Sequence, residues 1–212
     1  MILAIDTSHE SGSIALASPD GTLIEEMALD APGGFAQVLF GAIGDLLARH
    51  AAPVAALTKL AVAGGPGTFT GVRVGLAAAK GIAEGAGIGV VTVSNLAAIA
   101  AYGRGPVRAA FSDARRSEVY GAVFDGELGV VVPERVQPIA VWIDSLPPAA
   151  ELIATTFDAF DAALGDRVRT LAPRALAASI ARIAAGRLSS DPAAVDANYV
   201  RRSDAEMLWR DR

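Results

Sequence analysis

Several residue types are scarce or missing in this 212-residue chain, and each absence excludes a class of protein. The chain has no cysteine, which excludes disulfides, thiolate metal sites and a cysteine nucleophile. Its only histidines, His9 and His50, lack the spacing of a two-histidine metal motif, so we expect no metal site. No apolar run reaches the roughly 18 residues of a membrane-spanning helix, and we expect a cytoplasmic protein without membrane contacts.

The charge balance and the missing motifs also argue against several functions. Lys and Arg number 18 against 23 Asp and Glu, a net charge of −5, and the basic residues are scattered, so direct nucleic-acid binding is not expected. The chain lacks the Gly-x-Ser-x-Gly pattern of serine hydrolases and the Gly-Lys-Ser/Thr of a P-loop. Hydrophobic residues make up 52% and aromatic residues only 6%, which predicts a core packed by close backbone approach.

A similar strand pattern occurs in both halves of the chain. Residues 2–5 form an apolar run that ends at Asp6, and residues 107–111 form another that ends at Asp113. Each run is typical of a buried strand, and the turn residues that follow predict a hairpin. We therefore predict an α/β protein with two related lobes, residues 1–103 and residues 104–212. Apolar residues at helical spacing predict helices over residues 34–50, 71–85, 95–101, 149–164 and 173–186.

The glycine-rich stretch 64–71 follows a short apolar strand and leads into a helix. Free N–H groups at such a helix N-terminus suit an anion, although the P-loop lysine is missing. The alternative is that the glycines only allow a tight turn, with Thr68 or Thr70 as the helix cap.

Asp6 and Asp113 stand at equivalent positions after the first strand of each lobe. In two-lobed phosphotransferases of the actin type, this placement holds a metal and phosphates across a cleft. The alternative is that each carboxylate accepts hydrogen bonds from nearby backbone N–H groups.

Two helices carry faces of small residues. Opposite the apolar stripe of residues 34–50 lie Gln37, Gly41, Gly44 and Ala48, where a solvated face normally carries charges. The second helix aligns Gly71, Gly75, Ala78 and Ala79. Glycine inside a helix costs roughly 1 kcal/mol relative to alanine, so another helix packing on these faces would explain them. The contact is either with a partner subunit or within the chain.

Four segments, taken in order, carry a resemblance to a known family. They are Ala4-Ile5-Asp6-Thr7-Ser8, Gly65-Pro66-Gly67-Thr68-Phe69-Thr70-Gly71-Val72-Arg73-Val74-Gly75-Leu76, Asp113-Ala114-Arg115 with Glu118-Val119-Tyr120, and Tyr199-Val200-Arg201. The chain resembles the TsaB (YeaZ) family, whose bacterial members are required for the threonylcarbamoyladenosine modification of tRNA. The resemblance implies two lobes of the actin/Hsp70/sugar-kinase (RNase H-like) fold, the second reduced.

The resemblance also implies a catalytically silent subunit without a cofactor of its own. Such a subunit pairs with the transferase subunit TsaD through its first two long helices, and an ATPase subunit, TsaE, joins the assembly. The two small-residue faces are then the partner interface, and without its partner the chain would form a homodimer through the same surface. The complex, not this chain alone, would reach tRNA. The matched segments add Thr7, Arg115, Glu118 and Tyr120 to the candidate cleft around Asp6 and Asp113. The alternative function is an autonomous ATPase or small-molecule kinase of the same fold that uses Asp6 and Asp113 with Mg²⁺.

Overall fold

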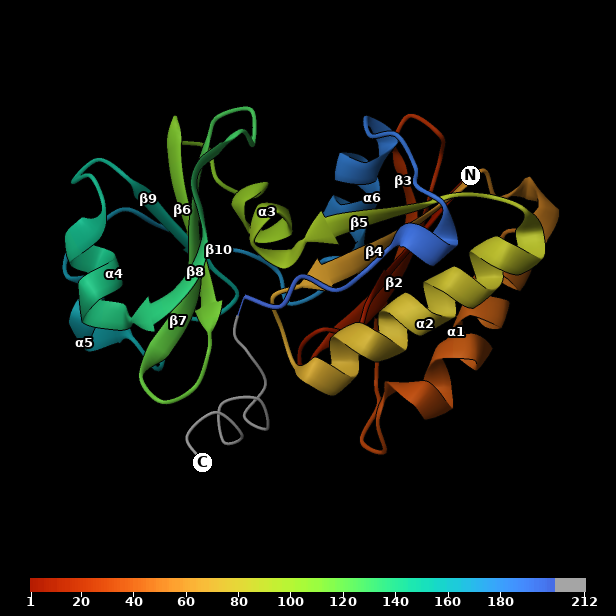
Figure 1. Cartoon of the computed structure of the whole chain (residues 1–212), viewed down its shortest axis with the longest axis horizontal. Helices are drawn as coiled ribbons and strands as arrows, with labels where there is room; N and C mark the ends of the chain where they lie inside the picture. Colours follow the sequence, from red (N-terminus) through yellow and green to blue (C-terminus); the bar gives the residue numbers. More distant parts are fainter. Residues whose placement is uncertain (201–212) are drawn as a thin grey trace. The chain divides into compact units, whose positions relative to one another are not determined.

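The computed structural model describes residues 1–200, which form two compact α/β units (Figure 1). The first unit comprises Met1–Ala98 and Arg174–Asn198, and the second is built on Ile99–Pro173. The sequence division at residue 103 therefore lies close to the first boundary. It places residues 174–198 in the wrong lobe, because that segment returns to the first unit.

The first unit is built on a five-stranded sheet in the order β3-β2-β1-β4-β5. Strands β1 (Ile2–Asp6), β2 (Gly12–Ala17) and β3 (Leu23–Leu29) are antiparallel, whereas β4 (Lys59–Gly65) and β5 (Val90–Ser94) run parallel to β1. A parallel neighbour needs a helical crossover, and two helices provide it: α1 (Phe35–Arg49) before β4 and α2 (Phe69–Ala86) before β5. A short turn of helix, η1 (Val54–Ala56), precedes β4.

The two faces of this sheet carry side chains of different size. Leu3 and Ile5 of β1 belong to the same buried cluster as the inward residues of α1 and α2, which lie side by side (Figure 1). Side chains alternate along a strand, so the opposite face presents Ala4 and its neighbour Ala61. Helix α6 (Ala177–Ala185) contacts all five strands, and small side chains on this face allow it to approach closely. The unit thus has three layers.

Helix α6 belongs to the first unit because that unit caps both of its ends. The hydroxyl of Ser13 accepts hydrogen bonds from the Leu176 and Ala177 amides at 3.1 and 3.0 Å, and α6 has no capping side chain of its own. At the other end, the Lys59 ammonium donates to the carbonyls of Ala184 at 2.8 Å and Arg187 at 2.6 Å. Orphan groups at helix ends need such partners, so these contacts hold residues 174–198 on the first sheet.

The second unit repeats the strand topology of the first, as predicted. Its sheet order is β8-β7-β6-β9-β10, in which β6 (Val107–Asp113), β7 (Glu118–Asp125) and β8 (Val130–Pro138) are antiparallel and β9 (Glu151–Ala154) and β10 (Arg169–Leu171) run parallel to β6. Helices α4 (Ile139–Ser145) and α5 (Asp161–Leu164) pack on one face around Phe111 and Trp142. The helix expected over residues 149–164 is wrong, because its first part is the buried strand β9. Helix α3 (Asn95–Ala100) spans the boundary between the units, and η2 (Pro192–Ala194) follows α6.

Candidate functional site

The glycine-rich turn between β4 and α2 packs directly on the end of β1. The Ser8 carbonyl accepts a hydrogen bond from the Thr68 amide at 2.7 Å, and a Cβ on Gly67 would lie 2.5 Å from that carbonyl oxygen. The Thr68 hydroxyl caps α2 by accepting from the Gly71 amide at 3.2 Å. The Gly65, Thr68 and Gly71 amides therefore bind groups of the chain itself, as expected for the tight turn of the alternative interpretation.

Asp6 joins three segments at the carboxyl end of the first sheet. Its Oδ1 accepts hydrogen bonds from the Ser8 amide at 2.9 Å and the Ser8 hydroxyl at 2.6 Å. Asn95 donates to the same hydroxyl at 2.7 Å and accepts from the Gly65 amide at 3.0 Å. Asp6 and Thr7 are each only 1% exposed. Asp6 therefore accepts local hydrogen bonds through Oδ1, as in the alternative interpretation, while its buried Oδ2 has no hydrogen-bond partner among the described residues.

Asn95 also belongs to this cluster, although the sequence does not identify it as a site residue. The sequence shows only that a polar residue directly follows the strand over residues 90–94. The cluster extends to His9, whose Nδ1 lies 2.8 Å from the Ser8 hydroxyl. Burial lowers the pKa of His9, against the opposing charges of Asp6 and Glu10. The imidazole is thus held towards its neutral form next to a buried carboxylate.

Asp113, in the second unit, shapes the hairpin between β6 and β7. Its Oδ1 accepts a hydrogen bond from the Arg115 amide at 2.7 Å. Arg115, Arg116 and Ser117 all have positive φ, between 58° and 65°, and the turn closes through bonds between Ala114, Arg115 and Glu118. Tyr120 is half-buried opposite Ser112 on the neighbouring strand. Asp6 and Asp113 lie in different units, and each accepts local backbone hydrogen bonds.

The outer face of α1 matches the prediction. Gln37, Gly41, Gly44 and Ala48 are all exposed, and no atom lies within 4 Å of a Cβ built on either glycine. Packing within the chain therefore does not explain these glycines. Phe40 lies beside them and is 62% exposed, although it falls outside both the apolar stripe and the small-residue line that the sequence revealed.

The predicted face of α2 is wrong. Gly71, Gly75, Ala78 and Ala79 are buried against the first sheet. A Cβ on Gly71 would lie 2.0 Å from the Thr7 carbonyl, and one on Gly75 would lie 2.6 Å from the Thr7 hydroxyl. These small residues serve the close approach of α2 to β1, which is the intrachain alternative.

A different set of small residues lies on the exposed side of α2. Ala77, Gly81 and Gly85 face away from the sheet, and Cβ atoms on the two glycines would meet nothing within 4 Å. Both helices pack on the same face of the sheet, so their outer sides point the same way (Figure 1). We define the α1–α2 face by its exposed residues: Gln37, Phe40, Gly41, Gly44 and Ala48 of α1 with Ala77, Gly81 and Gly85 of α2.

The two large side chains of the glycine-rich block also lie at the surface, at the start of α2. Phe69 is 46% exposed, and the Arg73 guanidinium stacks over its ring at 3.6 Å from the centroid. Such a cation–π pair fixes both side chains on the outer side of the first turns of α2. The block thus combines a buried packing half with an outward-facing half.

Two features are absent from residues 1–200. No group of three or more His, Asp or Glu side chains within this range could hold a metal ion. In the same range, no helix is both long enough and apolar enough to cross a membrane.

Comparisons with known proteins agree with these features. A family model described as "TsaD: tRNA N6-adenosine threonylcarbamoyltransferase" matches residues 31–199. The tRNA threonylcarbamoyladenosine biosynthesis protein TsaB of Bacillus subtilis (strain 168) is 37% identical over 151 residues, covering 68% of this chain and 65% of that protein. The protein of the same name from Escherichia coli (strain K12) is 39% identical over 127 residues, covering 58% of this chain and 54% of that protein. The chain thus matches about half to two thirds of the length of these relatives.

Solved structures show the same relationship at the level of the fold. YeaZ from Pseudomonas aeruginosa superposes with a TM-score of 0.79 at 25% identity, covering 93% of this chain and 98% of that one. The ethanolamine utilization protein EutJ from Carboxydothermus hydrogenoformans has a TM-score of 0.53 at 12% identity, covering 85% and 88%, and shares the fold alone. These likenesses confirm the predicted actin/sugar-kinase fold class. Together with the family match, they show that the chain belongs to the TsaB (YeaZ) family.

Proposed function

We propose that this chain is a non-catalytic partner subunit in the threonylcarbamoyladenosine modification of tRNA. The α1–α2 face would pair with a TsaD-type transferase subunit, and the complex would transfer the threonylcarbamoyl group to N6 of adenosine 37. The chain itself would bring neither a catalytic group nor a cofactor. A TsaE-type ATPase would join the pair, tRNA would be reached only through the complex, and the isolated chain would form a homodimer through the same face.

The observation that carries this proposal is the pair of glycine-bearing outer helix faces. Gly41, Gly44 and Gly81 each cost roughly 1 kcal/mol relative to alanine, and the first unit gains no contact in return. Small residues on adjacent helices let a partner helix approach closely, as in other helix packings. Phe40 adds a large exposed apolar side chain of the kind that anchors interfaces.

The alternative of an autonomous ATPase has less support. Asp6 is buried and its Oδ1 accepts hydrogen bonds from Ser8, and the Gly65, Thr68 and Gly71 amides bind groups of the chain itself. A kinase of this fold would need these groups accessible to a nucleotide and its metal.

The proposal is tested by light scattering on a sizing column, with the chain alone and mixed with the TsaD homologue of its own organism. We expect a stoichiometric complex with the wild type and none with Gly41→Arg or Gly81→Arg. Neither glycine has a neighbour that an added side chain would meet, so both variants should remain folded. Gly186→Arg is the matched control, because Gly186 is an exposed glycine of the first unit that also has open space around it.

Two outcomes contradict the proposal. One is a wild-type chain that does not bind the homologue but binds and hydrolyses ATP. The other is binding that survives both face variants unchanged, which would place the interface elsewhere on the chain.

A further inference from the structure

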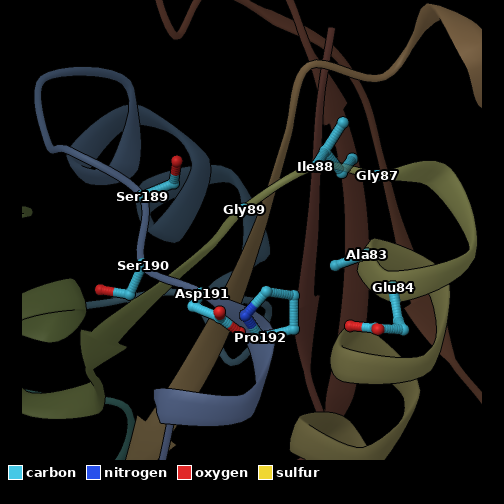
Figure 2. A pocket seen from close by; sticks show the side chains of 9 residues that line it. All are labelled: Ala83, Glu84, Gly87, Ile88, Gly89, Ser189, Ser190, Asp191 and Pro192. Carbon is cyan, nitrogen blue, oxygen red and sulfur yellow. The ribbon is translucent and has the colours of Figure 1, made fainter.

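The first unit also has an open cavity at the C-terminal end of α2, the opposite end of that helix from the glycine-rich turn. The cavity has a volume of about 430 Å³ and lies between the end of α2, the turn into β5 and the segment that follows α6. Figure 2 shows the residues that line it. This volume suits a small ligand or one long side chain. The lining residues are Ala83, Glu84, Gly87, Ile88, Gly89, Ser189, Ser190, Asp191 and Pro192.

The walls of this cavity are held in place by backbone contacts. Val90 and Ser190 exchange two backbone hydrogen bonds, at 3.0 and 2.8 Å, which fix the segment after α6 beside the edge of β5. Gly87 ends α2 with φ 65°, a conformation that favours glycine. A Cβ on Gly89 would lie 2.4 Å from the Ser189 hydroxyl oxygen, so the two walls are in direct contact at that point.

The charged residues that line the cavity, Glu84 and Asp191, are both acidic. Glu84 lies in the last turn of α2, where the helix dipole already contributes partial negative charge, and that turn has no basic residue. Within residues 1–200, no hydrogen bond or ion pair engages the Glu84 carboxylate. Asp191 supplies a second carboxylate, of which Oδ1 accepts the Ala193 amide at 2.8 Å. No Lys, Arg or His is among the lining residues, so these negative groups lack a counterion in the cavity itself.

We propose that this cavity binds a guanidinium or primary ammonium group carried on an aliphatic stem. Carboxylates pair most strongly with such groups, through charge-assisted hydrogen bonds to Glu84 and Asp191. The Ser189 hydroxyl offers a further acceptor, and Ala83, Ile88 and Pro192 are apolar lining residues that suit the stem. The ligand would be an Arg or Lys side chain of a protein or a free polyamine. This site is separate from the proposed pairing through the α1–α2 face, and its test does not depend on that pairing.

The test uses two probes of nearly the same shape, butylguanidinium and neutral butylurea, titrated into the ¹⁵N-labelled full chain; only the first is a cation. We expect butylguanidinium to cause saturable shifts of the Gly87, Gly89 and Ser190 amides, and butylurea to cause none. Glu84→Gln should weaken the binding of butylguanidinium roughly tenfold. Glu127→Gln, an equal charge change at an exposed site in the second unit, should leave it unchanged.

Two further probes distinguish the source of the cation. Tighter binding of acetyl-arginine methylamide than of spermidine would point to a protein side chain, and the reverse would point to a free polyamine. The proposal is overturned if butylguanidinium produces no saturable shifts at these amides. It is equally overturned if butylurea matches it, or if Glu84→Gln binds as tightly as the wild type.

Discussion

Gly75 and Gly81 lie on the same helix and should respond to alanine in opposite ways. At Gly75 the new methyl group would lie 2.6 Å from the Thr7 hydroxyl and 3.4 Å from Val62. That hydroxyl donates a buried hydrogen bond to the Gly71 carbonyl at 2.8 Å, which the methyl group would displace. At Gly81 the methyl group would meet no atom within 4 Å.

The expected magnitudes follow from these distances. Overpacking and the loss of a buried hydrogen bond together cost about 2–4 kcal/mol, and the higher helix propensity of alanine returns about 1 kcal/mol. Gly75→Ala should therefore lower the free energy of unfolding by about 1–3 kcal/mol. Gly81→Ala has only the propensity gain and should raise it by about 0.5–1 kcal/mol.

Thermal unfolding followed by circular dichroism at the helix band measures this difference, because the longest helices, α1 and α2, lie in the first unit. For a chain of this size, 1 kcal/mol corresponds to a shift of about 2–4 °C. The Gly75→Ala protein should melt below the wild type and the Gly81→Ala protein slightly above it. Equal midpoints for the two variants would refute the assignment of the buried and exposed faces of α2.

Two further predictions concern contacts that hold each unit together. Lys59→Met removes the ammonium that binds the last carbonyls of α6, so it should destabilise the first unit by about 1–3 kcal/mol in urea unfolding. The control Lys80→Met should have little effect. Equal effects of the two variants would mean that the Lys59 cap contributes nothing to stability. For Glu151 in the second unit, burial alone would raise the pKa, but hydrogen bonds from Thr170 and the Gly105 and Arg104 amides lower it on balance. A folded pKa below the unfolded value of about 4.3 means that ionised Glu151 stabilises the fold above that pH, and this stabilisation is lost as the pH falls through the folded pKa. Glu151→Gln should therefore reduce the loss of stability below about pH 5. Unfolding can be followed by the fluorescence of Trp142 in a Trp209→Phe background. An unchanged pH dependence would contradict this role.

The strand layout of both units could be predicted from the sequence. The apolar runs that end at Asp6 and Asp113, each followed by a hairpin, indicate the start of the two sheets, and the structure confirms the same strand order in both. This success has a physical reason, since a continuous apolar run bounded by turn residues is typical of a buried strand.

The sequence predicts the helices less well than the strands, because a helical pattern does not show which sheet the helix packs against. Residues 173–186 do contain α6, but its position on the first sheet depends on Ser13 and Lys59, far away in the sequence. Residues 152–154 are an apolar run too short to separate strand from helix by periodicity, and they lie in β9.

The candidate site shows the same limit at the level of single residues. Helix α2 has two lines of small residues, and the sequence does not indicate which of them the sheet covers. Only the close approach to Thr7 buries Gly75 and leaves Gly81 exposed. On α1 the stripe of Leu and Ile residues marks the buried side, so the sequence alone indicates the exposed line that contains Gly41.

Hydrogen–deuterium exchange of the chain, free and bound to the TsaD homologue, tests the central claim most directly. The proposal predicts that complex formation slows exchange in peptides from α1 and α2, the helices that carry Gly41 and Gly81. The Gly186→Arg control should show the same protection as the wild type. Protection confined to the second unit, with α1 and α2 unchanged, would contradict the assignment of the α1–α2 face as the partner surface.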